Sequence, residues 1–403
     1  MIVGWSHAGQ HAYVAGLGVA IPFVVAAFHT NYAVVGALLS VSAVAGSLLQ
    51  SLALVVRRTS ARVLLLGQNL GSTFGAALSA LAPGIAIFMG GRFIQAVTGW
   101  PQHPIGSSYL SNRHPERRGT ILSWHVTAGN IGTLAAPLAV SAVIASGGWQ
   151  WGFWLLAIVL ATTTVGVALW LPTPWHRLPA VSTQLEPSTP KGSDDLGSLG
   201  SFRHQVMQLL RQRSVLALLV AGTIAAGGQG IGILGVYVPA YLHSSLHFSA
   251  LKLGVVLTVV YIGAVIGPVL MGSIADHVGH RRILLANYAL GAVALLAFVA
   301  VGKGDIGLGL VGLAMGIFSY SELALRQTLF SDYLSGGLAR AGFGIFFTVS
   351  QAIGALWVAV IGLVVTDVGF AQAFLTMACT FLAAGIVVLA GTMGSPRQAR
   401  AST

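Results

Sequence analysis

The chain has 403 residues, of which 20 are lysine or arginine and nine are aspartate or glutamate, so that only 7% are charged. Hydrophobic residues make up 55% of the chain, whereas soluble domains have about 25% charged residues to cover their surface. These proportions exclude a cytosolic enzyme, a nucleic-acid-binding module and a disordered chain. They favour a helical protein that crosses the membrane many times, because backbone polar groups in lipid must be satisfied within each helix.

Twelve apolar segments are long enough to cross a membrane as helices, since a span needs about 20 mostly apolar residues. The first residues, Met1 to Tyr13, contain no lysine or arginine, so we expect a retained span there rather than a cleaved signal peptide. The predicted spans are 10–28, 32–56, 62–82, 84–110, 119–146, 149–171, 214–242, 249–275, 282–301, 306–331, 340–365 and 369–392.

The basic residues predict the orientation of these spans. With both termini in the cytoplasm, 16 of the 20 lysines and arginines lie in cytoplasmic segments, and only Lys252 and Lys303 lie on the opposite side. Cytoplasmic loops of membrane proteins carry such an excess of basic residues. The net charge of +11 is therefore interpreted as an orientation signal, and we expect no nucleic-acid partner.

Residues 173–213 divide the chain into two halves. The segment is rich in Pro, Ser and Thr and is predicted to be a flexible cytoplasmic linker. Its end, Phe202 to Ser214, is typical of a short amphipathic helix on the membrane surface. We therefore predict an N-terminal six-helix bundle over 1–172 and a C-terminal six-helix bundle over 214–403.

Weak internal similarity supports two homologous halves. The segment Gly18-Val19-Ala20-Ile21-Pro22 in the first span matches Gly235-Val236-Tyr237-Val238-Pro239 in the seventh. Two six-helix halves of the same orientation are a recurring plan of transporters, in which the substrate site lies between the halves near the bilayer midplane.

The loop after the eighth predicted span has a distinctive spacing of glycine, acidic and basic residues. Gly272 permits a close helix approach, Gly279 suits a turn, and Asp276 can cap a helix or pair with an arginine. With Arg281 and Arg282 the loop resembles the cytoplasmic signature of the major facilitator superfamily, Gly-x-x-Ala-Asp-x-x-Gly-x-Arg-Arg. In the fourth span, Arg92-Phe93-Ile94-Gln95-Ala96 resembles the family's Arg-x-x-Gln-Gly element.

The resemblance implies an all-α membrane protein of twelve transmembrane helices in two pseudo-symmetric six-helix bundles. It implies alternating access, with the loop of Gly272 to Arg282 latching the halves on the cytoplasmic side of a bacterial inner membrane. The corresponding N-half loop departs from the pattern, because Leu52 and Val56 occupy its Gly and Asp positions. The antiporter motif of the fifth span is also not intact.

A finer resemblance lies in the N-terminal half. Ser6-His7, Gln102-His103-Pro104 and Gly129-Asn130-Ile131-Gly132 are similar to bacterial facilitators of the fosmidomycin-resistance-like and anion:cation symporter branches. Those branches imply small organic anions or anionic antibiotics as substrates.

Three ionisable residues lie well inside predicted spans, where charge is costly and indicates function. Arg92 is predicted to bind an anionic substrate or to tune a proton site. Glu322 and Arg326, four apart on one helix face, are interpreted either as a structural ion pair or as a proton-linked switch. In the switch, either protonation of Glu322 frees Arg326, or a substrate anion replaces Glu322 as the partner of Arg326. Two buried arginines against one glutamate favour an anionic substrate.

Five further polar residues are candidates for substrate contact: Gln10, His11, His103, Gln229 and Tyr237. His7 and His11 have a spacing that can chelate a metal, but no Cys, Asp or Glu in the first span completes a site. Substrate contact, proton contact and helix packing remain open for them, and we predict no metal and no cofactor.

The sequence predicts a proton-coupled secondary transporter of a small organic anion, with export favoured, acting as a monomer in the lipid bilayer. An uptake symporter for a small metabolite and a non-transporting receptor or scaffold of the same fold remain alternatives. A lipid-modifying membrane enzyme needs a nucleophile or metal cluster at a membrane face. No such motif is found, so no catalytic residue is expected.

Overall fold

The computed structural model describes residues 1–50, 52, 56, 59–172, 206–334 and 339–393, and this part of the chain is helical throughout its regular elements. Most of the predicted linker, 173–205, lies outside the described residues. Residues 206–210 are helical and Leu209 is buried while Met207 is exposed, in keeping with the amphipathic helix predicted there.

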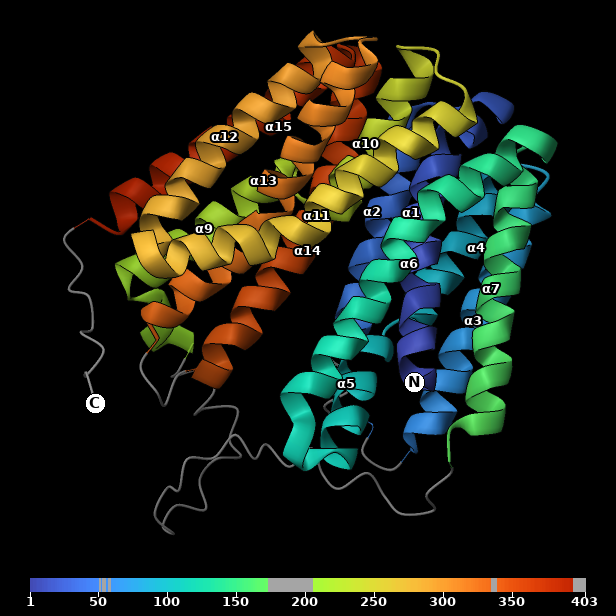
Figure 1. Ribbon diagram of the computed structural model, residues 1–403, viewed down its shortest axis with the longest axis horizontal. Coiled ribbons are helices and arrows are strands. Elements are labelled where there is room, and N and C mark those ends of the chain that lie inside the picture. Colours follow the sequence, from blue (N-terminus) through green and yellow to red (C-terminus); the bar gives the residue numbers. More distant parts are fainter. Residues whose placement is uncertain (51, 53–55, 57–58, 173–205, 335–338, 394–403) are drawn as a thin grey trace.

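Over residues 1–50 and 59–172, the described part of the N-terminal half has seven α-helices, which Figure 1 shows. They are α1 (Ile2–Ala27), α2 (Tyr32–Leu49), α3 (Ala61–Ala80), α4 (Ile85–Thr98), α5 (Gln102–Arg113), α6 (Arg118–Gly147) and α7 (Trp149–Trp170), with a 3-10 turn, η2 (Pro115–Arg117), before α6.

After the short helix at 206–210, the described residues of the C-terminal half form seven α-helices and one 3-10 turn. They are α9 (Arg213–Ala225), η3 (Ala226–Gly228), α10 (Gly230–Ser244), α11 (Ala250–Val278), α12 (His280–Ala300), α13 (Asp305–Asp332), α14 (Ala339–Asp367) and α15 (Phe370–Gly391).

Local sequence signals set where these helices begin. Asn31 and Ser249 accept hydrogen bonds through their side chains from backbone N–H groups of the first turns of α2 and α11. Such caps satisfy donors that have no partner within the helix. Between α6 and α7 the chain reverses at Gly148, whose φ of 91° lies in the region that only glycine adopts without strain.

The twelve predicted spans are confirmed as helical segments, and two of them are broken. Ten helical stretches in the described residues are long and apolar enough to cross a membrane. The other two segments are α3, which contains the polar residues Gln68 and Asn69, and the fourth span, which is divided into α4 and α5. The seventh span is interrupted by η3.

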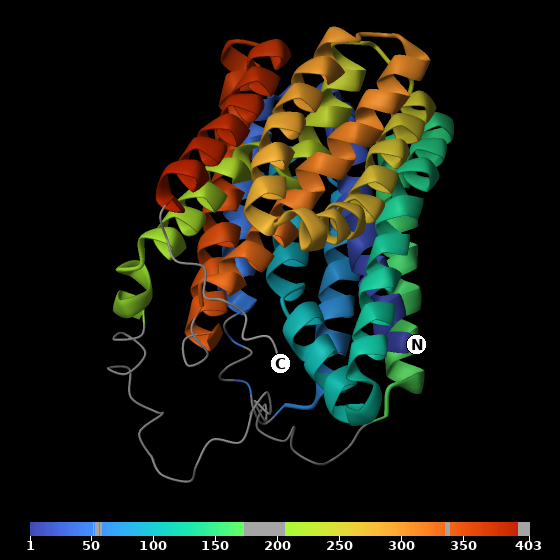
Figure 2. The ribbon, with the colours of Figure 1, turned by 60° about the vertical axis from the view of Figure 1, so that its left-hand side comes forward.

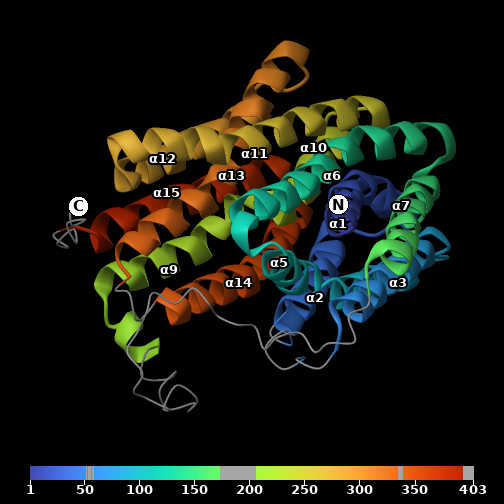
Figure 3. The ribbon, with the colours of Figure 1, turned by 60° about the horizontal axis from the view of Figure 1, so that its bottom comes forward.

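The two halves lie side by side and meet along three pairs of helices, α2 with α14, α6 with α11, and α1 with α10 (Figure 3). Here we call the end of the molecule where α1 ends and α2 begins the closed face. The opposite end, where α1 begins and α7 ends, is the linker face. In Figures 1 and 2 the halves converge at the closed face and diverge toward the linker face.

Close backbone contacts hold the closed face together. A Cβ placed on Gly18 of α1 would lie 1.9 Å from the carbonyl oxygen of Gly235 in α10, so these helices touch through their backbones. Nearby, the hydroxyls of Tyr32 and Ser244 are 2.9 Å apart, and the Ser40 hydroxyl donates to the Ala355 carbonyl over 2.6 Å.

Candidate functional site

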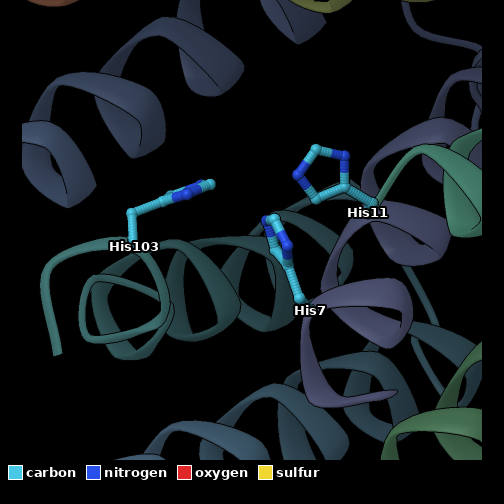
Figure 4. Close-up of side chains that lie close together, drawn as sticks. All are labelled: His7, His11 and His103. Carbon is cyan, nitrogen blue, oxygen red and sulfur yellow. The ribbon is translucent and has the colours of Figure 1, made fainter. Parts of the chain in front are cut away.

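A break in the fourth span brings polar residues of two segments together. Helix α4 ends at Thr98, and Pro101 has no backbone N–H with which to continue it. A new helix, α5, begins at Gln102. This restart places His103 in the first turn of α5, beside the first third of α1 (Figure 4).

Four histidines from three helices form what we call the histidine cluster: His7, His11, His103 and His125. The ring of His7 lies at its centre, with centroids 4.5 Å from His11, 5.0 Å from His103 and 4.1 Å from His125. His7 and His125 are each 3% exposed, whereas His103 is exposed. The cluster therefore extends from the packed interior of the N-terminal half to its accessible surface.

Hydrogen bonds orient two of these rings. The His7 Nδ1–H donates to the His125 carbonyl over 2.8 Å, because a carbonyl can only accept. The Thr133 hydroxyl donates to the Gly129 carbonyl and can therefore accept from the His11 Nδ1–H, at 3.0 Å. In both rings the Nε2 atom is left with a free lone pair.

A second chain of polar groups leads from Arg92 to the first span. The Arg92 guanidinium donates to Gln95 Oε1 over 2.6 Å, Gln95 donates to Gln10 Oε1 over 3.0 Å, and Gln10 donates to the Ser72 hydroxyl. These residues come from α4, α1 and α3. The structure thus joins the predicted site residues Arg92 and Gln10, and Gln10 is the chain neighbour of His11.

Polar residues of α3 form a second network, which the sequence interpretation missed. Gln68 donates to Gln102 Oε1 over 2.6 Å, and the Ser6 hydroxyl lies 3.0 Å from Asn69 Oδ1 and 2.9 Å from Gln102 Oε1. The two adjacent amides, Gln68 and Asn69, inside an apolar segment could have predicted this network, because buried polar groups require hydrogen-bond partners.

The other predicted intramembrane charges form a buried pair inside the C-terminal half. Arg326 Nε donates to Glu322 Oε1 over 2.7 Å, and the Tyr288 hydroxyl donates to the same oxygen over 2.7 Å. Both charged residues are 0% exposed. The Arg326 guanidinium also packs 4.4 Å from the centre of the Phe346 ring. Within the described residues, Glu322 Oε2 has no hydrogen-bond partner.

The remaining predicted substrate residues, Gln229 and Tyr237, lie apart from the histidine cluster. Gln229 precedes α10 at the break in the seventh span and is partly buried. The fully buried Tyr237 donates through its hydroxyl to the Val358 carbonyl of α14, within the same half. A Cβ on Gly36 of α2 would lie 2.7 Å from this hydroxyl, so Tyr237 also contacts the N-terminal half. The structure therefore places Tyr237 in the contact that closes one face.

The loop motif has a turn at its glycine and an acidic residue beside a histidine. Gly279 has a φ of 107° and makes the expected turn. Of the two roles expected for Asp276, a helix cap or an arginine pair, no arginine pair occurs among the described residues, where Asp276 contacts His280 at 3.1 Å. His280 also contacts Asp332 at 2.8 Å, which ties the loop to the end of α13. The expected close helix approach at Gly272 is absent, because a Cβ there would meet no atom within 4 Å.

The two arginines of the motif lie at the start of α12. Arg281 donates to the Leu389 carbonyl of α15 over 3.2 Å, so it connects two helices of the same half. The contacts of Asp276, His280 and Arg281 described above therefore all lie within the C-terminal half. This agrees with the separation of the two halves at the linker face.

Comparison with known proteins identifies the family. The chain matches the profile of the Major Facilitator Superfamily over residues 6–253 and 218–403, and thus along both halves. The chain belongs to this superfamily. The predicted membership of the superfamily and the all-α, twelve-span fold class are thereby confirmed.

Relatives with described functions are distant. A Haemophilus influenzae protein named for metabolite transport is 25% identical over 282 residues, covering 69% of this chain and 66% of that protein. A proline/betaine transporter of Escherichia coli is 25% identical over 258 residues, covering 60% of this chain and 50% of its own length. A multidrug resistance protein B homolog of Mycobacterium tuberculosis is 23% identical over 338 residues, covering 74% and 58%. The chain thus matches about half to two thirds of these relatives.

Solved structures agree with the fold over nearly the whole chain. The nucleoside transporter NupG superposes with a TM-score of 0.75 at 14% identity, covering 98% of both chains. A bacterial homolog of the human lysosomal transporter Spinster, in an inward-facing and unoccupied conformation, superposes with a TM-score of 0.70 at 13% identity, covering 97% and 94%. At these identities the likeness concerns the fold alone.

Proposed function

We propose that this chain is a secondary transporter that exports a small organic anion across a bacterial inner membrane, coupled to protons, by alternating access. Membership of the major facilitator superfamily and the transporter names of its relatives support movement of a small molecule. The finer statements, on charge, coupling and direction, rest on the residues described next.

The one-sided contact between the halves supports alternating access. The linker face ends in arginines such as Arg113, Arg117 and Arg282, whereas Lys252 lies toward the closed face. Basic residues mark the cytoplasmic side, so the linker face and both termini are assigned to the cytoplasm. The conformation is then closed to the outside, and rocking of the halves exposes the central region to one side at a time.

The observation on which the anion proposal depends is the environment of Arg92. Its guanidinium donates to the neutral amide of Gln95, its Nε has no hydrogen-bond partner among the described residues, and none of their ion pairs includes it. A permanent positive charge inside the membrane without an acidic partner is costly. A substrate carboxylate or phosphonate that approaches Arg92 supplies the missing negative charge and is bound for that reason.

Proton coupling is assigned to Glu322. One of its oxygens accepts from both Arg326 and Tyr288, while Oε2 has no partner in the described part of the chain. A proton on Oε2 removes the charge that holds Arg326 and weakens both hydrogen bonds. The Tyr288–Glu322 hydrogen bond joins α12 to α13, so protonation of Glu322 loosens packing within the C-terminal half.

Export is proposed on the finer sequence resemblance and on the multidrug resistance relative. A thermal-shift screen of the purified chain with organic anions, sugars and cationic drugs identifies the ligand, since a ligand of the folded state raises its apparent stability. Its flux is then measured in proteoliposomes in both directions, with and without a pH gradient.

The matched variants test each statement separately. We expect Arg92→Gln to abolish transport and the exposed loop variant Arg113→Gln to retain it. Glu322→Gln should keep gradient-free counterflow and lose stimulation by a pH gradient, whereas Glu116→Gln, in an exposed turn, should keep both. Anion transport like that of the wild type in both Arg92→Ala and Arg326→Ala would refute the anion site, and an unchanged pH response in Glu322→Gln would make Glu322 structural.

A further inference from the structure

The histidine cluster has the geometry of a transition-metal site. His7, His11 and His103 each offer one ring nitrogen, and the three nitrogens lie within 4.8 Å of one another (Figure 4). We propose that these three imidazoles bind a divalent transition-metal ion such as Zn²⁺, independently of what the protein transports. The sequence argument against a metal considered only ligands of the first span, but the third ligand comes from α5.

Two of the imidazoles are already oriented as metal ligands. Histidines that bind metals usually donate their second ring N–H to a carbonyl or another acceptor, which fixes the ring and leaves the opposite nitrogen free. His7 donates through Nδ1 to the His125 carbonyl. The Thr133 hydroxyl, which donates to the Gly129 carbonyl, accepts from His11 in the tautomer that carries its proton on Nδ1. The Nε2 lone pairs of both rings are then available.

The His7 ring nitrogen is the strongest single indication of a ligand. His7 is 3% exposed, and its Nε2 has no hydrogen-bond partner among the described residues. A buried nitrogen that makes no hydrogen bond costs about 1–3 kcal/mol. A metal ion bound at Nε2 removes this cost, whereas packing of the ring against other histidines does not.

The spacing of the three nitrogens fits one ion after a small movement. In a tetrahedral zinc site with Zn–N bonds of about 2.0–2.1 Å, the nitrogens lie about 3.3–3.5 Å apart. The separation of up to 4.8 Å requires the rings to approach one another slightly. His103 can provide this movement, because its side chain is exposed at the start of α5.

Ligand chemistry favours zinc, copper or nickel over magnesium or calcium. Imidazole nitrogen suits the former ions, whereas the latter prefer oxygen ligands. Three protein ligands also leave at least one of the four positions of a tetrahedral ion free. The three rings contribute no negative charge, so an anionic group is the favoured occupant of that position.

The space for the two inner rings is made by a glycine. A Cβ on Gly129 of α6 would lie 2.9 Å from His7 Cε1 and 3.2 Å from His11 Cδ2, closer than ordinary contact. Gly119 lies in the same helix, and a Cβ there would meet no atom within 4 Å. These two positions offer a matched pair of alanine variants.

The test measures Zn²⁺ binding to the purified full chain in detergent after removal of metals with a chelator. Because the chain has 12 histidines, a control variant replaces the three that surround the pocket at the closed face with glutamine, namely His29, His243 and His247. Titration calorimetry gives the affinity, and Co²⁺ substitution gives visible absorption bands that report nitrogen coordination.

We expect one saturable site in the wild type and in the closed-face control. His103→Gln, a change at an exposed side chain, should weaken that site by at least about 100-fold and remove the Co²⁺ bands, since even outer-shell changes cost about 10–100-fold. Thr133→Val and Gly129→Ala should weaken binding by about 10–100-fold while Gly119→Ala does not. Absence of saturable binding, or equal binding by wild type and His103→Gln, overturns the proposal, as does loss of binding in the closed-face control alone.

Discussion

Replacement of Gly18 by alanine tests whether the closed face opens during the working cycle. The new Cβ would lie 1.9 Å from the Gly235 carbonyl oxygen, against 3.4 Å for an ordinary contact, so α1 and α10 must separate there by about 1.5 Å. Overpacking of this kind costs about 1–3 kcal/mol. If the halves are apart at this point in the conformation open at the closed face, the overpacking does not destabilise that conformation.

The expected result is a shift of population and not a loss of folding. An energy difference of about 1–3 kcal/mol changes the ratio of the two conformations by about 5–150-fold in favour of the state open at the closed face. Spin labels on cysteines introduced at Thr30 and Ser245, with the exposed Cys379 replaced by serine, measure the distance across this face.

Gly90→Ala is the control, because a Cβ at that position would meet no atom within 4 Å. Gly18→Ala should give a longer and more populated distance between the labels, and Gly90→Ala should match the wild type. A distance distribution in Gly18→Ala that is the same as in the wild type refutes the argument that the two halves separate at this contact.

Three further substitutions probe other contacts. Gly222→Ala places a Cβ 2.2 Å from Arg326 Cζ and displaces a buried charge, so the free energy of unfolding should fall by about 3–5 kcal/mol; a denaturation midpoint equal to that of the wild type contradicts this. Tyr237→Phe removes the hydrogen bond from α10 to the Val358 carbonyl of α14, within the C-terminal half, so chemical denaturation should show a free energy of unfolding lower by about 1 kcal/mol; an unchanged value contradicts this. Lys252→Ala breaks the ion pair with Asp305, whose side chains are 40% and 72% exposed. The loss of stability should be less than about 1 kcal/mol, so the melting temperature should fall only slightly.

The span pattern was predictable because a lipid environment imposes it locally. In the membrane, the backbone N–H and C=O groups must be hydrogen-bonded within each helix. A long apolar segment can therefore be predicted as a membrane helix from its length and hydropathy alone. The breaks were harder to predict. Pro101 stands inside an apolar run, and Pro22, Pro137, Pro239 and Pro268 lie inside helices that continue. Whether a proline ends a helix thus depends on neighbouring helices that re-satisfy the backbone.

Side-chain partners between distant segments were not predictable from one sequence. The spacing of Glu322 and Arg326 on one helix face revealed their pairing, which the structure confirms. The approach of His103 to His7 was not visible, because 96 residues separate them and the packing of α5 against α1 decides it. For the same reason, the contacts of His280 with Asp276 and Asp332 were not visible in the sequence, which suggested a helix cap or an arginine pair for Asp276.

The two buried arginines place different demands on membrane insertion. A charged side chain at the centre of an inserting helix costs about 2.5–3.5 kcal/mol. Arg326 has its carboxylate partner one turn away on the same helix, so the charge is neutralised within α13 and needs no partner from another helix for insertion. Arg92 has only the amide of Gln95 on a helix of 14 residues. Gln95 in turn bonds to Gln10 of α1, so the fourth span depends on a helix that enters the membrane before it.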